Sequence, residues 1–109
     1  MKEVMAIGFA EASKVPESFD SGQLNGNIYH IACKSWTTTE GKVMPLSFKF
    51  EGDDGSIIMV TNIQILYSED KNFSGIPSRE FGCEAIIGGL FRTFRLILYC
   101  ESCKWVMVI

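Results

Sequence analysis

Two tight turns within residues 81–109 constrain the fold of this chain more than any other feature. Gly88-Gly89 is a two-residue linker of the kind that supplies positive φ in a β-hairpin, and Glu101-Ser102 fits a second such turn. Together they predict three antiparallel strands. Side chains alternate along a strand, so one register brings nearly all the apolar groups onto one face. The predicted cross-strand pairs are Ile87 with Leu90, Cys83 with Phe94, Phe81 with Leu96, Cys100 with Cys103, Leu98 with Trp105, Leu96 with Met107 and Phe94 with Ile109.

The middle of the chain shows the same alternation. Leu46, Phe48 and Phe50 alternate with polar residues, which is typical of a strand with one face in water. Residues 52–55 then predict a four-residue hairpin loop, which would place Phe50 opposite Ile57 and Phe48 opposite Met59. A return strand over residues 56–67 would put these apolar side chains on one side: Ile57, Met59, Ile63, Ile65 and Tyr67. Further strands are expected at residues 4–9 and 28–39, with long loops at 10–27 and 68–80.

These patterns predict one fold class. No segment keeps a 3.6-residue hydrophobic period over three turns, so little helix is expected. The chain has 109 residues, the size of one domain, and 47% of them are hydrophobic, enough for a core without cross-links. We predict a single all-β antiparallel domain over residues 1–109. Its strands, about seven in number, would form consecutive hairpins in a small barrel or a two-layer sandwich.

Charge and the start of the chain narrow the function classes. The net charge is −3, from 10 basic and 13 acidic residues, which argues against sequence-independent binding of nucleic acid. The acidic residue at position 3 and the short apolar run after it fit neither a signal peptide nor a membrane span. The expected compartment is the cytosol, where four cysteines stay reduced.

Cys100 and Cys103 form a C-x-x-C pair, the usual half of a structural zinc site, and are therefore the candidate metal ligands. The strand register argues against completing the site with Cys83. That residue lies opposite Phe94, about 20 Å along the strand from Cys100, whereas zinc–sulfur bonds are about 2.3 Å. A redox role is also disfavoured, because reactive C-x-x-C pairs sit at a helix N-terminus. The favoured interpretation is that Cys100 and Cys103 end the core face of the hairpin, and no cofactor is expected.

His30 is the only histidine, so any histidine-based mechanism must use it. It lies in a predicted strand, on the face shared with Ala32 and Lys34, which favours an ordinary strand histidine. A thiol-dependent enzyme would need His30 beside a cysteine or a carboxylate in a cleft.

The last third of the chain also carries basic and aromatic residues that could line a base-stacking face: Phe91, Arg92, Arg95, Tyr99 and Lys104. That face is amphipathic rather than strongly basic. We therefore favour the interpretation that this face is solvated or covered by protein over the interpretation that it binds nucleic acid.

A second apolar stripe lies behind the core stripe and consists of Ile86, Phe91, Ile97, Val106 and Val108. An open sheet in a monomer would expose it, and such a surface normally marks an interface or a ligand groove. We therefore predict a non-catalytic β-domain that forms a homodimer through this stripe. A peptide or small molecule held between the long loops is a second option. The alternatives are a thiol-dependent or metal-binding protein using Cys100 and Cys103 with His30, or a nucleic-acid-binding β-barrel.

Overall fold

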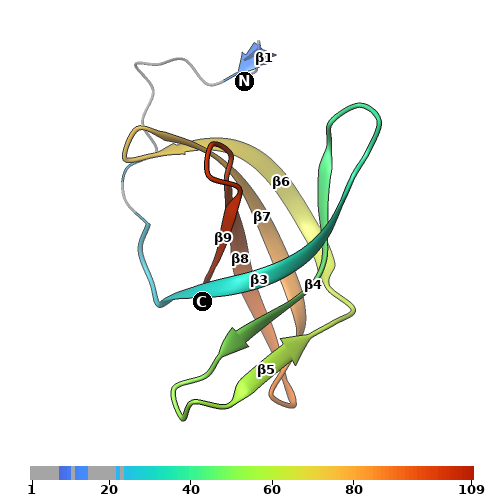
Figure 1. Cartoon of the computed structure of the whole chain (residues 1–109), viewed down its shortest axis with the longest axis vertical. Helices are drawn as coiled ribbons and strands as arrows, with labels where there is room; N and C mark the ends of the chain where they lie inside the picture. Colours follow the sequence, from blue (N-terminus) through green and yellow to red (C-terminus); the bar gives the residue numbers. More distant parts are fainter. Residues whose placement is uncertain (1–7, 11, 15–21, 23) are drawn as a thin grey trace.

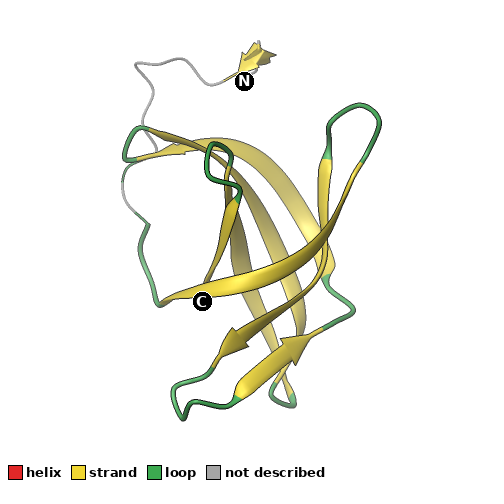
Figure 2. Cartoon of the chain, viewed as in Figure 1, coloured by secondary structure: helices red, strands yellow, loops and turns green. Residues whose placement is uncertain are grey.

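The computed structural model describes residues 8–10, 12–14, 22 and 24–109. In these residues the regular structure is entirely strand, as predicted (Figure 2). The strands are β1 (Gly8–Ala10), β2 (Ala12–Lys14), β3 (Ile28–Thr37), β4 (Val43–Glu51), β5 (Ile57–Val60), β6 (Gln64–Phe73), β7 (Ile76–Ile87), β8 (Leu90–Tyr99) and β9 (Lys104–Val108). Most of the strand predicted at residues 4–9, and half of the loop predicted at 10–27, lie outside the described residues.

Seven strands form one antiparallel sheet in the order β5-β4-β3-β9-β8-β7-β6, and β1 pairs with β2 separately. The sheet curls into a half-barrel, with β3 and β4 crossing over β7, β8 and β9 (Figure 1). The prediction of an antiparallel all-β domain of about seven strands is confirmed. In the described part of the chain, no helix is long and apolar enough to cross a membrane.

The predicted register of the last three strands is confirmed. Gly88 and Gly89 take φ angles of 57° and 84°, and β7 pairs with β8 from Ile87 opposite Leu90 onward. In the next hairpin Leu98 pairs with Trp105, also as predicted. All the remaining predicted pairs that fall within these strands are present: Cys83 with Phe94, Phe81 with Leu96 and Leu96 with Met107.

The interpretation of Cys100 and Cys103 as core residues is wrong. Both side chains are exposed, because the turn between β8 and β9 spans four residues and contains both cysteines. The Cys103 N–H donates to the Tyr99 carbonyl at 2.8 Å, and Cys103 has a φ of 58°. The register is unchanged, but the cysteines lie beyond the last pair of the ladder, Tyr99 with Lys104.

The loop between β4 and β5 is one residue longer than predicted. The Gly52 N–H donates to the Ser56 carbonyl at 2.8 Å, so Ser56 stands opposite Gly52, and the paired strands begin one residue later than predicted, with Ile57 opposite Glu51. The Asp54 carboxylate holds Ser56 in this position, since Oδ1 accepts bonds from the Ser56 N–H at 3.0 Å and from its hydroxyl at 2.6 Å. The predicted pairs are wrong for this reason: Phe50 pairs with Ile58, and Phe48 pairs with Val60.

This shift reverses the two faces of β5. Ile58 and Val60 point into the half-barrel, and Val60 is fully buried. Ile57 and Met59 point outward and are 67% and 57% exposed. A shift of one residue moves every side chain of a strand to the opposite face.

The single return strand over residues 56–67 and the loop over 68–80 are also wrong. The chain turns after Val60, where Asn62 has a φ of 55°, and β6 and β7 then form a long hairpin closed at Ser74-Gly75. The charged residues that suggested a loop lie on these strands. Asp70, for example, pairs directly with Arg79 and forms an ion pair with it.

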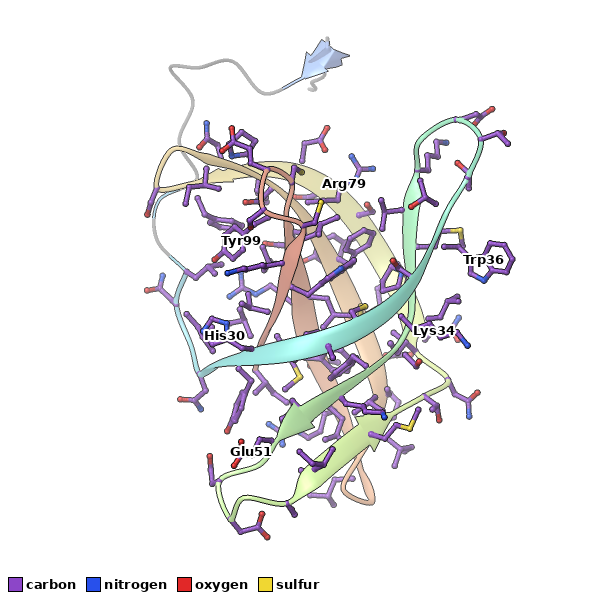
Figure 3. All side chains as sticks on the ribbon, in the orientation of Figure 1. His30, Lys34, Trp36, Glu51, Arg79 and Tyr99 are labelled. Atoms are coloured by element: carbon purple, nitrogen blue, oxygen red, sulfur yellow. The ribbon has the colours of Figure 1, made fainter. Side chains whose placement is uncertain are left out.

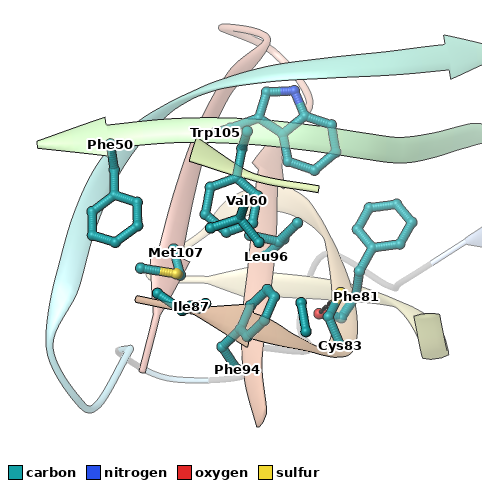
Figure 4. Packing of buried hydrophobic residues seen from close by; sticks show 11 residues of the cluster. Phe50, Val60, Phe81, Cys83, Ile87, Phe94, Leu96, Trp105 and Met107 are labelled. Carbon is teal, nitrogen blue, oxygen red and sulfur yellow. Dashed lines mark hydrogen bonds between the residues drawn. The ribbon is translucent and has the colours of Figure 1, made fainter. Parts of the chain in front are cut away.

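The interior of the half-barrel is filled by one apolar cluster (Figure 4). Phe48 of β4 packs edge-on against Phe94 of β8 with ring centroids 5.6 Å apart, which joins the two sides of the curl. Phe81 stacks on Trp105 at 5.7 Å. The buried members of the cluster are Phe48, Phe50, Val60, Phe81, Cys83, Ala85, Ile87, Phe94, Leu96, Trp105 and Met107.

Candidate interaction surface

The structure places the five residues of the predicted interface in two different surroundings. Three of them, Ile97, Val106 and Val108, are 0–3% exposed and form a second apolar cluster on the outer face of the sheet. Phe73 and Leu24 of the same chain pack over this cluster. A partner could reach these three side chains only by displacing the residues that cover them.

The other two predicted residues, Ile86 and Phe91, are 57% and 63% exposed. They face each other across β7 and β8, next to the Gly88-Gly89 turn. Met59 of β5 joins them along one groove of about 470 Å³, which Asn62, Gln64 and Glu84 also line. With Ile57, two residues before Met59 on the same face of β5, these side chains form an apolar surface. We name this surface the seam surface; it consists of Ile57, Met59, Ile86 and Phe91.

The topology explains why this surface lies where it does. β5 and β6 are the two edges of the sheet, and residues 61–63 connect them directly. β6 begins at Gln64, opposite Glu84, so β7 continues for three residues beyond its pairing with β6. β5 lies against this end of β7, near the β7–β8 turn (Figure 1). The groove therefore follows the seam where the half-barrel does not close by strand pairing.

The candidate metal ligands Cys100 and Cys103 lie together in the β8–β9 turn. Among the described residues, no group of three or more His, Cys, Asp or Glu side chains is placed to hold a metal ion. Partial desolvation raises the pKa of the Cys100 thiol, and the nearby Asp70 carboxylate raises it further. A raised pKa lowers the thiolate fraction, and the thiolate is the form that attacks electrophiles or binds metal.

The other two cysteines lie at the core. Cys83 is buried and Cys33 is half-buried. Burial raises the pKa of each thiol to about 12, and the proximity of Cys33 adds to the rise at Cys83. Both thiols are therefore protonated at neutral pH and behave as small apolar groups.

The structure does not bring His30 and a thiol together. His30 is exposed at the beginning of β3 and forms no hydrogen bond or ion pair with any residue that the structure describes (Figure 3). Cys33, three residues away, points to the opposite face. Val106, the cross-strand neighbour of His30, is three residues from Cys103, or about 10 Å along a strand. This geometry does not support the thiol–imidazole alternative.

The basic residues proposed for nucleic-acid binding are also divided. Arg95 is bonded to Glu80 at 3.3 Å and to the Asn25 carbonyl at 2.9 Å, so its charge is largely neutralised by its own chain. Arg92 is opposite Ala85, a residue of the core cluster, and so belongs to the other face of β8. The two arginines therefore do not form one basic surface.

Sequence reasoning missed a polar cluster on the outer face of β6, β7 and β8. The Tyr67 hydroxyl donates to Glu80 at 2.6 Å, and the Tyr67 ring lies directly over Gly82. Glu80 is only 5% exposed and also accepts a bond from Arg95. Desolvation raises the pKa of Tyr67 to about 12, and the bond to the Glu80 carboxylate adds to this rise. The sequence did not reveal this cluster, because the charged residues within 68–80 predicted a loop where β6 and β7 pair.

No protein-family model, no curated protein and no solved structure matches this chain. Function is therefore inferred from the geometry of the described residues. The seam surface brings three of their exposed large apolar side chains, Met59, Ile86 and Phe91, together along one groove.

Proposed function

We propose that this chain is a non-catalytic β-domain that associates with a second copy of itself through the seam surface. The observation that carries the proposal is the exposure of four large apolar side chains, 57–67% each, three of which line one groove. Isolated exposed apolar residues are ordinary, but a contiguous set beside a groove normally marks an interaction site. The four free thiols are consistent with a cytosolic setting.

The size of the surface fits a dimer. Each of the four side chains leaves roughly 100–150 Å² outside the protein, so the set offers about 500 Å² of apolar area. A stable interface buries about 800 Å² on each partner, of which somewhat more than half is apolar. The seam surface can therefore supply the apolar part of one side of a two-fold interface.

The test is the mass of the native protein, measured by native mass spectrometry and sedimentation without chelator. The wild type is expected at twice its 12.2 kDa mass, and Phe91→Glu and Ile86→Glu at the monomer mass. These two variants introduce a charge at an exposed site, so they should still unfold cooperatively. Ile76→Glu is the matched control, because Ile76 is 42% exposed at the β6–β7 turn, outside the seam surface.

Two results would contradict the proposal. One is a wild type that remains monomeric at several hundred micromolar. The other is a dimer that Ile76→Glu disrupts and Phe91→Glu does not. A monomer that carries zinc and loses it in Cys103→Ser would instead support the metal-binding alternative.

A further inference from the structure

The two edges of the sheet are protected to different degrees. β6 carries Glu69, Asp70 and Lys71, has an irregular register after Ile65, and is bridged by Gly22 at its Phe73 end. Charges and irregularities of this kind prevent edge strands from pairing with another chain. β5, at the other edge, is the uncharged sequence Ile-Ile-Met-Val without proline or bulge. An edge of this kind is a template for strand addition.

The hydrogen bonding of the β4–β5 hairpin identifies the free backbone groups of β5. The Gly52 N–H donates to the Ser56 carbonyl, so this pair is a hydrogen-bonded pair of the ladder. Bonded and non-bonded pairs alternate in an antiparallel ladder. Ile58 and Val60 therefore bond to β4, whereas Ile57 and Met59 direct their N–H and C=O groups away from β4.

We propose that two copies of the chain join by antiparallel pairing of β5 with β5 about a two-fold axis, forming one continuous sheet. This inference rests on the proposed self-association and specifies the contact that produces it. Ile57 of one copy would exchange both backbone bonds with Met59 of the second copy, with Ile58 at the axis. Symmetry repeats the exchange, so all the free groups of Ile57 and Met59 are used.

The same register accounts for the exposed apolar side chains of β5. Directly opposite residues in an antiparallel pair point to the same face. Ile57 and Met59 of both copies would therefore gather on the outer face, close to Ile86 and Phe91 of each. No charged residue lies within β5, so the symmetric pairing brings no like charges together. A second copy fits this edge better than an unrelated peptide, because the short strand is complementary to itself.

Amide hydrogen exchange tests the pairing directly. In a concentrated sample the Ile57 and Met59 amides are expected to exchange slowly, and on dilution to the monomer they should exchange rapidly. Ile58 and Val60 serve as internal controls, since their bonds to β4 protect them at both concentrations. Equal, fast exchange of the Ile57 and Met59 amides in a sample shown to be dimeric would overturn the inference.

A pair of variants isolates the backbone donor. Met59→Pro removes an N–H that β4 does not use, and proline is tolerated at such an edge position. Met59→Ala removes the same side chain and keeps the donor. Met59→Pro should raise the dimer dissociation constant about tenfold or more relative to Met59→Ala, because one donor is lost from each copy.

The outcomes separate this inference from the proposed function. If Met59→Pro and Met59→Ala dimerise equally well, β5 pairing is refuted while self-association through side chains stands. If the wild type is monomeric throughout, both are refuted. Circular dichroism of each variant establishes that it is folded, and the exchange measurement on the wild type needs no variant.

Discussion

The substitution Gly82→Ala should destabilise the domain far more than an alanine in a strand normally does. A Cβ at position 82 would lie 1.9 Å from Cε2 and 2.4 Å from Cδ2 of Tyr67. Contacts that short are impossible, so the aromatic ring must leave its place over the β7 backbone. The glycine is thus required by the close approach of a ring.

Displacing the ring breaks the bond between the Tyr67 hydroxyl and Glu80, which measures 2.6 Å. Glu80 is 5% exposed, and water cannot easily replace the lost donor. A hydrogen bond to a charged group contributes about 1.5–3 kcal/mol, and the lost ring packing adds roughly 1 kcal/mol. Alanine recovers about 0.5–1 kcal/mol relative to glycine in a strand. The free energy of unfolding should therefore fall by about 2–3 kcal/mol.

The assay is urea denaturation of four proteins: the wild type, Gly82→Ala, Tyr67→Ala and the double variant. Once the ring has been removed, an alanine at position 82 meets no obstacle, so the double variant should be no less stable than Tyr67→Ala. The double-mutant cycle should give a coupling energy of about 2 kcal/mol. A loss below 0.5 kcal/mol for Gly82→Ala, or additive losses in the double variant, would refute the reasoning.

Two further predictions concern pH and thiols. Folding raises the pKa of Tyr67 from 10.0 to about 12, so the neutral hydroxyl contributes stability that is complete below pH 10 and is lost as the pH rises through 12. The difference in melting temperature between the wild type and Tyr67→Phe should therefore stay constant below pH 10 and shrink between pH 10 and 12. In a native titration with Ellman's reagent, the exposed Cys100 and Cys103 should react well before Cys33 and Cys83, whose pKa values are about 12, and equal rates for all four thiols would contradict the described burial.

The register of β7 and β8 could be predicted because their turn is marked by its own residues, and the register of β9 was also correct because the four-residue turn keeps the predicted pairs in step. Two adjacent glycines leave little choice of turn, and the strands on both sides then align by alternation. The loop between β4 and β5 has no such marker. Whether Ser56 stands opposite Glu51, as predicted, or opposite Gly52 depends on its hydrogen bonds to Asp54, and composition does not reveal that contact. One residue of error was enough to exchange the two faces of β5.

The β6–β7 hairpin was missed for a different physical reason. An edge strand with one face in water can be as polar as a loop, and the charges of β6 are those that protect such an edge. The outer apolar stripe was predicted, but its division into a covered part and an exposed part was not. Ile97, Val106 and Val108 are covered by Leu24 and Phe73, which are distant in sequence, whereas Ile86 and Phe91 are left exposed.

The presence of outward apolar side chains on β5 does not depend on whether the hairpin takes the predicted register or the observed one. All four residues of β5 are apolar, so either register would turn two apolar side chains into the core and two outward. β4, its neighbour in the same hairpin, places Lys49 and Glu51 outward, as a face in water requires. On the same outer face, the pair of Ile86 and Phe91 follows the polar pair of Glu84 and Thr93. These outward apolar side chains of β5, β7 and β8 thus lie at the seam between β5 and β7, where the packing of one copy leaves each of them more than half exposed.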